Sequence, residues 1–218
     1  MEYTINIKGH LMDLSTPQVM GILNVTPDSF YSGSRKQTEM EIAQRANQII
    51  EEGGSIIDVG AFSTRPGADE VSEEEEGRRL KFALDIVRRE QPDAAISVDT
   101  YRPTLARKCI EEWGADIIND VSEGGITGIV NVPLEQRQEE YPEMFRVVGE
   151  LKVPYILMSV QPTLARMMKG FAREVQQLRD LGAKDIILDP GFCFGKNLIQ
   201  NYQIYDEMEK LNVMELPV

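Results

Sequence analysis

The sequence predicts an α/β fold of the TIM (β/α)8-barrel type, here with about six βα units. Six short apolar runs each end in a polar residue, and a helix-like stretch follows nearly every run. The polar residues are Asn24, Asp58, Asp99, Asn119, Ser159 and Asp189. They lie 20 to 41 residues apart, about the length of one strand–helix unit. In a parallel barrel such residues meet at the mouth, where amide and carboxylate groups suit a small polar heterocycle.

A β-hairpin is predicted before the first unit. Residues 3–7 and 11–14 flank Lys8-Gly9-His10, which has the composition of a tight turn. His10 is the only histidine in the chain. Because it lies in this turn, we assign it no part in catalysis.

The strands and helices of the barrel are predicted from apolar runs and capping signals. The six strands cover residues 19–23, 56–59, 95–98, 117–118, 155–158 and 186–188. Two helices begin at capping boxes, Thr38-x-x-Glu41 and Ser72-x-x-Glu75, and end near Glu52 and Glu90. A third opens at Pro103, a residue suited to the first turn. Three more cover residues 142–151, 168–181 and 198–210. Residues 121–140 show no clear period and are predicted as loop, either without regular structure or with one short helix.

The predicted barrel is incomplete at its C-terminal end. A closed eight-stranded barrel takes about 250 residues. This chain has 218 residues and stops at Leu216-Pro217-Val218, where a seventh strand would begin. We therefore expect a single barrel domain over residues 1–218 that lacks its last strands, in a chain that is truncated rather than naturally six-stranded.

Composition excludes several classes of protein. A net charge of −13 argues against nonspecific binding to nucleic acid or to anionic membranes. No apolar stretch approaches the roughly 20 residues that cross a bilayer, and the N-terminus lacks a signal-peptide pattern. Cys109 and Cys193 are too far apart in sequence to indicate a disulfide framework or a metal site. The cytoplasm is the expected location.

Four motifs, in order along the chain, carry a family resemblance. Residues 20–30 read MGILNVTPDSF and residues 56–76 read IIDVGAFSTRPGADEVSEEEE. Residues 96–125 read ISVDTYRPTLARKCIEEWGADIINDVSEGG, and residues 186–197 read IILDPGFCFGKN. Together they closely resemble the dihydropteroate synthase family of the folate pathway. The resemblance implies a transferase that condenses (7,8-dihydropterin-6-yl)methyl diphosphate with p-aminobenzoate, giving 7,8-dihydropteroate and diphosphate.

Three of the strand-end residues are expected to bind the pterin ring. The Asp189 carboxylate could accept two parallel hydrogen bonds from an amidine-like edge. Asp99 and Asn119 could meet other polar ring atoms, and the resemblance assigns all three residues to pterin binding. From spacing alone, each could equally cap a strand end or the following helix.

Other site residues follow mainly from the resemblance. It assigns Asn24 to the leaving diphosphate or its Mg²⁺, and an amide oxygen is a suitable ligand for that ion. Arg65 could hold phosphate oxygens through its planar guanidinium. On this basis the catalytic residues are Asn24, Arg65 and Asp99.

The p-aminobenzoate pocket is expected to involve Thr64, Pro66 and Phe194, and Met158 is a further substrate-binding residue implied by the resemblance. Taken without the family, the stretch 63–67 would be an exposed connection and Phe194 part of a small satellite core.

The sequence departs from the family pattern in three places. Cys193 occupies a position that is commonly glycine, which affects loop freedom. Ser159 follows Met158 where histidine is common. The family's lysine, arginine and histidine contacts to pterin and diphosphate would lie beyond Val218, so we expect the 218-residue chain to lack normal turnover. Asp58 is assigned only a structural hydrogen bond.

Two other functions remain open from the sequence. A pterin-binding methyltransferase domain acting on methyltetrahydrofolate would keep counterparts of Asn119 and Asp189 but would not need the loop at residues 63–66. A non-catalytic pterin-binding fragment is the second alternative. The partners are small-molecule substrates, and the resemblance favours a homodimer.

Overall fold

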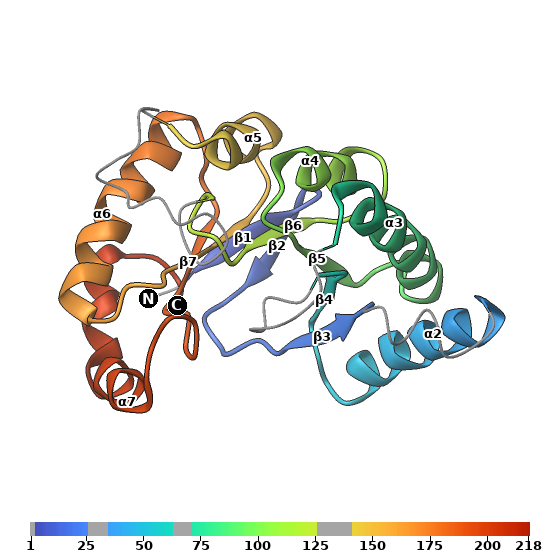
Figure 1. Cartoon of the computed structure of the whole chain (residues 1–218), viewed down its shortest axis with the longest axis horizontal. Coiled ribbons are helices and arrows are strands. Elements are labelled where there is room, and N and C mark those ends of the chain that lie inside the picture. The colour runs from blue at the N-terminus through green and yellow to red at the C-terminus, as the bar shows by residue number, and fades with distance from the viewer. Residues whose placement is uncertain (1–2, 26–34, 63–70, 126–140) are drawn as a thin grey trace. The chain divides into compact units, whose positions relative to one another are not determined.

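The computed structural model describes residues 3–25, 35–62, 71–125 and 141–218. Two compact units make up the chain: residues 16–119 form one, and residues 1–15 with 120–218 form the other. Both contain parallel strands joined through helices, as the colours along the chain in Figure 1 show. The predicted α/β fold with six parallel strands is therefore confirmed.

The unit of residues 16–119 contains four consecutive strands. These are β3 (Met20–Asn24), β4 (Ile56–Gly60), β5 (Ala95–Asp99) and β6 (Ile117–Asp120), which pair in parallel in that order. Three helices follow the first three strands: α2 (Arg35–Glu51), α3 (Glu73–Glu90) and α4 (Pro103–Glu111). Helix α3 packs against both α2 and α4 (Figure 1). Strands β4 and β5 are buried almost throughout, as expected for parallel strands covered by helices.

The start of α2 differs from the prediction. The helix begins at Arg35, so Thr38 lies inside it and is not the cap of a capping box. Thr38 is buried, as are Ile42, Ala46 and Ile49, which recur at helical spacing. Thr38 therefore extends the buried face of the helix by one turn, and this packing outweighs the local capping signal.

The predicted cap of α3 is present. The Ser72 side chain accepts a hydrogen bond from the backbone N–H of Glu75 at 3.2 Å. The Glu75 carboxylate pairs with Arg78 and Arg79 rather than completing the box, and hydrogen bonding to Arg78 chiefly lowers its pKa to about 2. Four glutamates in the first turn also complement the helix dipole.

The other unit opens with the predicted hairpin. Strands β1 (Thr4–Ile7) and β2 (His10–Asp13) pair antiparallel around Lys8 and Gly9. Both turn residues have positive φ, 48° and 89°, as a two-residue turn of type I′ requires. His10 lies in β2 beside this turn and is exposed.

Two further βα units complete this part of the chain. Strands β7 (Tyr155–Met158) and β8 (Ile186–Asp189) pair in parallel. The helices are α5 (Glu143–Leu151), α6 (Leu164–Asp180) and α7 (Leu198–Glu207), followed by the 3-10 helix η2 (Met208–Met214). Among the described residues, no helix is long and apolar enough to cross a membrane.

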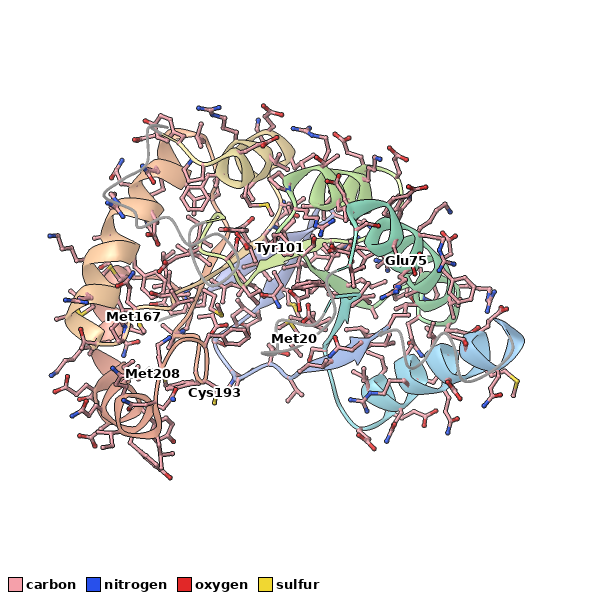
Figure 2. The ribbon with its side chains drawn as sticks, viewed as in Figure 1. Met20, Glu75, Tyr101, Met167, Cys193 and Met208 are labelled. Carbon is pink, nitrogen blue, oxygen red and sulfur yellow. The ribbon has the colours of Figure 1, made fainter. Side chains whose placement is uncertain are left out.

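Two helix boundaries in this unit differ from the prediction. Helix α6 begins at Leu164, four residues early, because Thr163 caps it and its buried face already includes Leu164 and Met167. Met167 is labelled on this helix in Figure 2. Helix α7 ends at Glu207, and the expected last turn is a 3-10 helix instead. A full capping box between Asn197 and Gln200 starts α7.

The last residues of the chain lie beside β8. The backbone N–H of Leu188 donates to the Pro217 carbonyl at 2.8 Å, and Leu216 is buried. This is the segment where the sequence predicts the start of a seventh strand.

A buried ion pair joins α3 to the beginning of β5 and β6. Arg88 donates to the Asp116 carboxylate at 2.7 Å and to the carbonyls of Ala94 and Gly114. The same Asp116 oxygen accepts from the backbone N–H of Ile96 at 2.8 Å. The Asp116 side chain is 2% exposed, so it depends on these partners rather than on water.

Replacing Asp116 by alanine should lower the free energy of unfolding by about 3 kcal/mol, because it removes the carboxylate that neutralises Arg88 and leaves the Ile96 N–H without its acceptor. Urea unfolding measures this loss. Asp85→Ala is the matched control, since it removes an exposed ion pair with Lys81 and should cost less than about 1 kcal/mol. Equal losses in the two variants would show that the Asp116 contact adds nothing beyond a surface pair.

Candidate active site

Parallel register places three of the predicted site residues on one line. Asn24 lies opposite Gly60, Gly60 opposite Asp99, and Asp99 opposite Asn119. Residues paired in this way point to the same face of a sheet. The structure therefore brings Asn24, Asp99 and Asn119 together at the carboxyl ends of β3, β5 and β6.

Gly60 leaves a space between two of these side chains. A Cβ atom at Gly60 would lie 2.8 Å from Asn24 Oδ1 and 3.3 Å from Asp99 Oδ2. An amide oxygen and a carboxylate oxygen thus both lie near the position that a side chain at residue 60 would occupy. Oxygen atoms of this kind suit a hard cation such as Mg²⁺, which usually keeps several waters and substrate phosphates as its other ligands. The described residues hold no cluster of three or more His, Cys, Asp or Glu side chains that could bind a metal.

Asp58 lies two residues before this line, deeper in β4. Its Oδ2 accepts a hydrogen bond from Asn119 Nδ2 at 3.1 Å, and both side chains are buried. Burial raises the pKa of Asp58, while Ser97 and Asn119 act in the opposite direction. The structural hydrogen bond expected for Asp58 is therefore present.

In the other unit, Asp189 ends β8 directly opposite Met158 of β7. Asp189 Oδ1 accepts from the backbone N–H of Gly191 at 2.8 Å. Burial raises the pKa of Asp189, partly offset by this hydrogen bond and by the nearby Lys196 charge. A half-exposed carboxylate held on one oxygen keeps acceptor capacity for a ligand.

The loop after β8 is held closely over the end of β7. Lys196 Nζ donates to three carbonyls, those of Ser159 at 2.8 Å, Gly191 at 2.8 Å and Phe194 at 3.1 Å. Gly191 has φ 62°, and any Cβ there would clash with the Ser159 carbonyl. Burial lowers the pKa of Lys196 to about 8, although the carboxylates of Asp189 and Glu123 raise it.

Comparison with known proteins places this arrangement in a family. A family model described as pterin binding enzyme matches residues 20–218. The dihydropteroate synthase of Escherichia coli K12 is 35% identical over 226 residues, which cover 97% of this chain and 74% of that protein. The chain belongs to the dihydropteroate synthase family of pterin-binding enzymes.

Solved structures agree with this assignment. Dihydropteroate synthase from Xanthomonas albilineans with 4-aminobenzoic acid has a TM-score of 0.84 and 30% identity, covering 100% of this chain and 77% of that one. The same enzyme in complex with 7,8-dihydropteroate has a TM-score of 0.80 and 27% identity, covering 99% and 76%. The predicted resemblance to the dihydropteroate synthase family is confirmed.

One polar contact beside Met158 was not predicted. Ser159 is buried and donates its hydroxyl to Glu123 Oε1 at 2.7 Å. Glu123 is itself buried, has φ 56°, and its pKa is raised by burial. The only sequence signal for this contact was the Glu-Gly-Gly stretch after β6, whose link to a residue 36 positions away cannot be seen locally.

Cys193 has a backbone conformation that glycine adopts more readily than other residues. Its φ is 71°, in the left-handed region, and its N–H donates to Asn201 Oδ1 at 2.8 Å. The side chain is exposed, on the loop after β8 (Figure 2). A cysteine in this conformation therefore strains the backbone of the loop.

Three predicted site residues, Thr64, Arg65 and Pro66, lie outside the described residues, as does the Thr26-Pro27-Asp28-Ser29 stretch. Their roles stay predictions from the family motif.

Cys193→Gly should raise the free energy of unfolding by about 0.5 to 1 kcal/mol. Relief of left-handed strain gains about 1 to 2 kcal/mol, and the greater freedom of glycine in the unfolded chain offsets part of that gain. Thermal or urea unfolding measures the change. Cys193→Ser, which keeps the strain and removes the thiol, should change stability little, and a glycine variant no more stable than the serine variant would contradict the prediction.

Proposed function

We propose that this chain binds (7,8-dihydropterin-6-yl)methyl diphosphate and p-aminobenzoate and joins them into 7,8-dihydropteroate. The observation that carries the proposal is the in-register line of Asn24, Asp99 and Asn119 within a family match over residues 20–218. Solved relatives that hold 4-aminobenzoic acid and 7,8-dihydropteroate support both substrate classes.

The pterin ring is assigned to Asp99, Asn119 and Asp189. The Asp189 carboxylate accepts two parallel N–H bonds from the aminopyrimidine edge of the ring, an arrangement that is strong and geometrically selective. Asp99 and Asn119 meet other polar ring atoms. Met158, opposite Asp189 in register, supplies apolar contact to the ring.

The p-aminobenzoate ring is assigned to Thr64, Pro66 and Phe194. Of these three residues, the structure describes Phe194, which is half-buried on the loop after β8. The Phe194 backbone N–H donates to the Gly191 carbonyl, and the Phe194 carbonyl accepts from Lys196 Nζ. Lys196 therefore fixes the backbone that carries the proposed wall of this pocket.

The diphosphate end is assigned to Asn24, Arg65 and Mg²⁺. Asn24 Oδ1, beside Asp99 Oδ2 over Gly60, fits an oxygen-ligated magnesium ion. When bound, that ion neutralises charge on the leaving diphosphate. Arg65 would hold phosphate oxygens through its two-pronged guanidinium.

The reaction needs no nucleophilic side chain. The C–O bond between the dihydropterin methylene and diphosphate breaks, and the aromatic amine forms a C–N bond to the same carbon and loses a proton. Asp99, Asn119 and Asp189 hold the ring in which positive charge develops as the C–O bond breaks. Orientation and electrostatic stabilisation of the departing diphosphate carry the catalysis.

Single-domain organisation over residues 1–218, a cytoplasmic location and a homodimer stay predictions from the sequence. The binding and chemistry proposed above depend on none of the three.

Calorimetry with the pterin diphosphate, p-aminobenzoate and methyltetrahydrofolate, beside a dihydropteroate assay on the same preparation, tests the function. We expect binding of the first two ligands and formation of dihydropteroate at less than normal turnover. Preferred binding of methyltetrahydrofolate without binding of p-aminobenzoate would indicate the methyltransferase alternative. Binding of both substrates without product would indicate a non-catalytic pterin-binding fragment.

Asp189→Asn should weaken pterin binding by about 2 to 4 kcal/mol, because the amide accepts one N–H bond and turns its own donor toward the second. Calorimetric titration with 6-hydroxymethylpterin monophosphate measures the loss. Asp185→Asn, four residues before the end of β8, is the control and should leave affinity unchanged. Affinity of the Asp189 variant within twofold of the parent would remove Asp189 from the site.

Gly60→Ala should weaken binding of the diphosphate-bearing substrate about tenfold and raise the Mg²⁺ concentration that this binding needs. The reason is that the new methyl group would lie 2.8 Å from Asn24 Oδ1. Titration with the pterin diphosphate at several Mg²⁺ concentrations measures both effects. Gly170→Ala, whose Cβ would have only ordinary contacts, is the matched control. An unchanged Mg²⁺ dependence in Gly60→Ala would exclude Asn24 as a ligand.

A further inference from the structure

Asp58 has no part in the contacts proposed above, yet it is hydrogen-bonded to a residue that does. We propose that Asp58 is a positioning residue that holds the Asn119 carboxamide in one orientation, with Nδ2 toward Asp58 and Oδ1 available to the pterin as a hydrogen-bond acceptor. The inference rests on the proposed assignment of Asn119 to the pterin ring.

The argument begins with the symmetry of a carboxamide. Its oxygen and nitrogen ends have almost the same shape, so packing alone does not decide which end faces a ligand. Asp58 Oδ2 lies 3.1 Å from the Asn119 amide nitrogen, and both residues are less than a tenth exposed. Turning the amide over would place two oxygen acceptors against each other with no hydrogen between them. Burial keeps water from relieving that contact.

The position of Asp58 makes it a support rather than a ligand contact. In β4 it lies opposite Ile22 and Ser97, whereas the line of site residues runs through Gly60 two positions later. Asp58 is 5% exposed, and Ser97 is completely buried beside it. Asn119, at 8% exposed, lies in the line itself and can present its remaining amide atoms to a ligand.

The carboxylate is not explained by the stability of the fold. Asp58 Oδ1 is buried without a hydrogen bond of good geometry among the described residues, and the Ser97 hydroxyl offsets only part of the effect of burial, which makes the charged side chain costly. Its pKa is raised by burial, so its contribution to stability is greatest below its unfolded pKa and is lost as pH rises through the folded pKa. At neutral pH an uncharged side chain of the same shape should therefore be tolerated as well or better.

Asp58→Asn separates positioning from folding. The variant keeps the shape of Asp58, but its own amide can turn either its oxygen or its nitrogen toward Asn119, so the orientation of Asn119 is no longer imposed. We expect affinity for 6-hydroxymethylpterin monophosphate to fall about tenfold, while the urea midpoint at neutral pH stays unchanged or rises. A purely structural role would lower both.

Asn119→Ala and the double variant complete the cycle. Asn119→Ala should weaken binding of the same ligand at least as much as Asp58→Asn does. Adding Asp58→Asn to the Asn119→Ala variant should weaken binding by less than about twofold more, because Asp58 acts through Asn119. p-Aminobenzoate affinity should be unchanged throughout, which provides an internal control.

Each contrary result has a distinct meaning. Unchanged affinity in Asp58→Asn beside weakened binding in Asn119→Ala would overturn the positioning role and leave the pterin site in place. The positioning role would also be overturned if Asp58→Asn lowered pterin affinity equally in the parent chain and in the Asn119→Ala variant. A lowered urea midpoint in Asp58→Asn would overturn it too. Unchanged affinity in Asn119→Ala would instead show that the proposed pterin contact is wrong.

Discussion

In-register pairing of neighbouring parallel strands is the constraint on which the candidate site depends. Hydrogen bonding between β3, β4, β5 and β6 sets which residues face each other, and this alone aligns Asn24, Gly60, Asp99 and Asn119. Asn24 and Asn119, 95 positions apart in sequence, thereby reach one line. A shift of one residue in any strand would turn its side chain to the opposite face.

Buried carboxylates organise the strand ends around this register. Asp120, at the end of β6, is fully buried and accepts from the backbone N–H groups of Ser122 and Gly124 and from the Tyr155 hydroxyl. Glu123 accepts from Ser159 in the same unit. Burial raises the pKa of both carboxyl groups, because it disfavours their charged form. The hydrogen-bond donors around each group offset part of this cost. The loop after β6 is thus ordered by side-chain acceptors rather than by strand hydrogen bonds.

The sequence predicted the features that depend on local pattern. The hairpin at Lys8-Gly9, the cap at Ser72 and the strand-end polar residues all follow from turn chemistry, capping and apolar runs. It was wrong at Thr38, where burial against the sheet outweighed the capping signal, and it placed the start of α6 too late.

Turn, capping and apolar-run patterns do not predict contacts between residues that are distant in sequence. The three carbonyls around Lys196 and the link from Ser159 to Glu123 join loops that come together only in the folded chain. The positive φ of Glu123 was equally hidden, because this conformation is expected of glycine and not of glutamate. Family motifs located Asp189 and Phe194 but carried no information on what holds their loop.

The pairing of an aspartate at 58 with an asparagine at 119 follows from the electrostatics of a buried contact. Two carboxylates 3.1 Å apart in this surrounding could not both ionise, and a shared proton would make the acceptor facing the ligand depend on pH. An asparagine at both positions would leave the orientation of each amide undetermined. An aspartate at 58 and an asparagine at 119 avoid both the shared proton and the undetermined amide orientation. The Asp58 carboxylate can only accept, so it bonds to the Asn119 Nδ2 group and not to Oδ1. The cost is one buried, poorly partnered carboxylate oxygen in β4, two residues before Gly60.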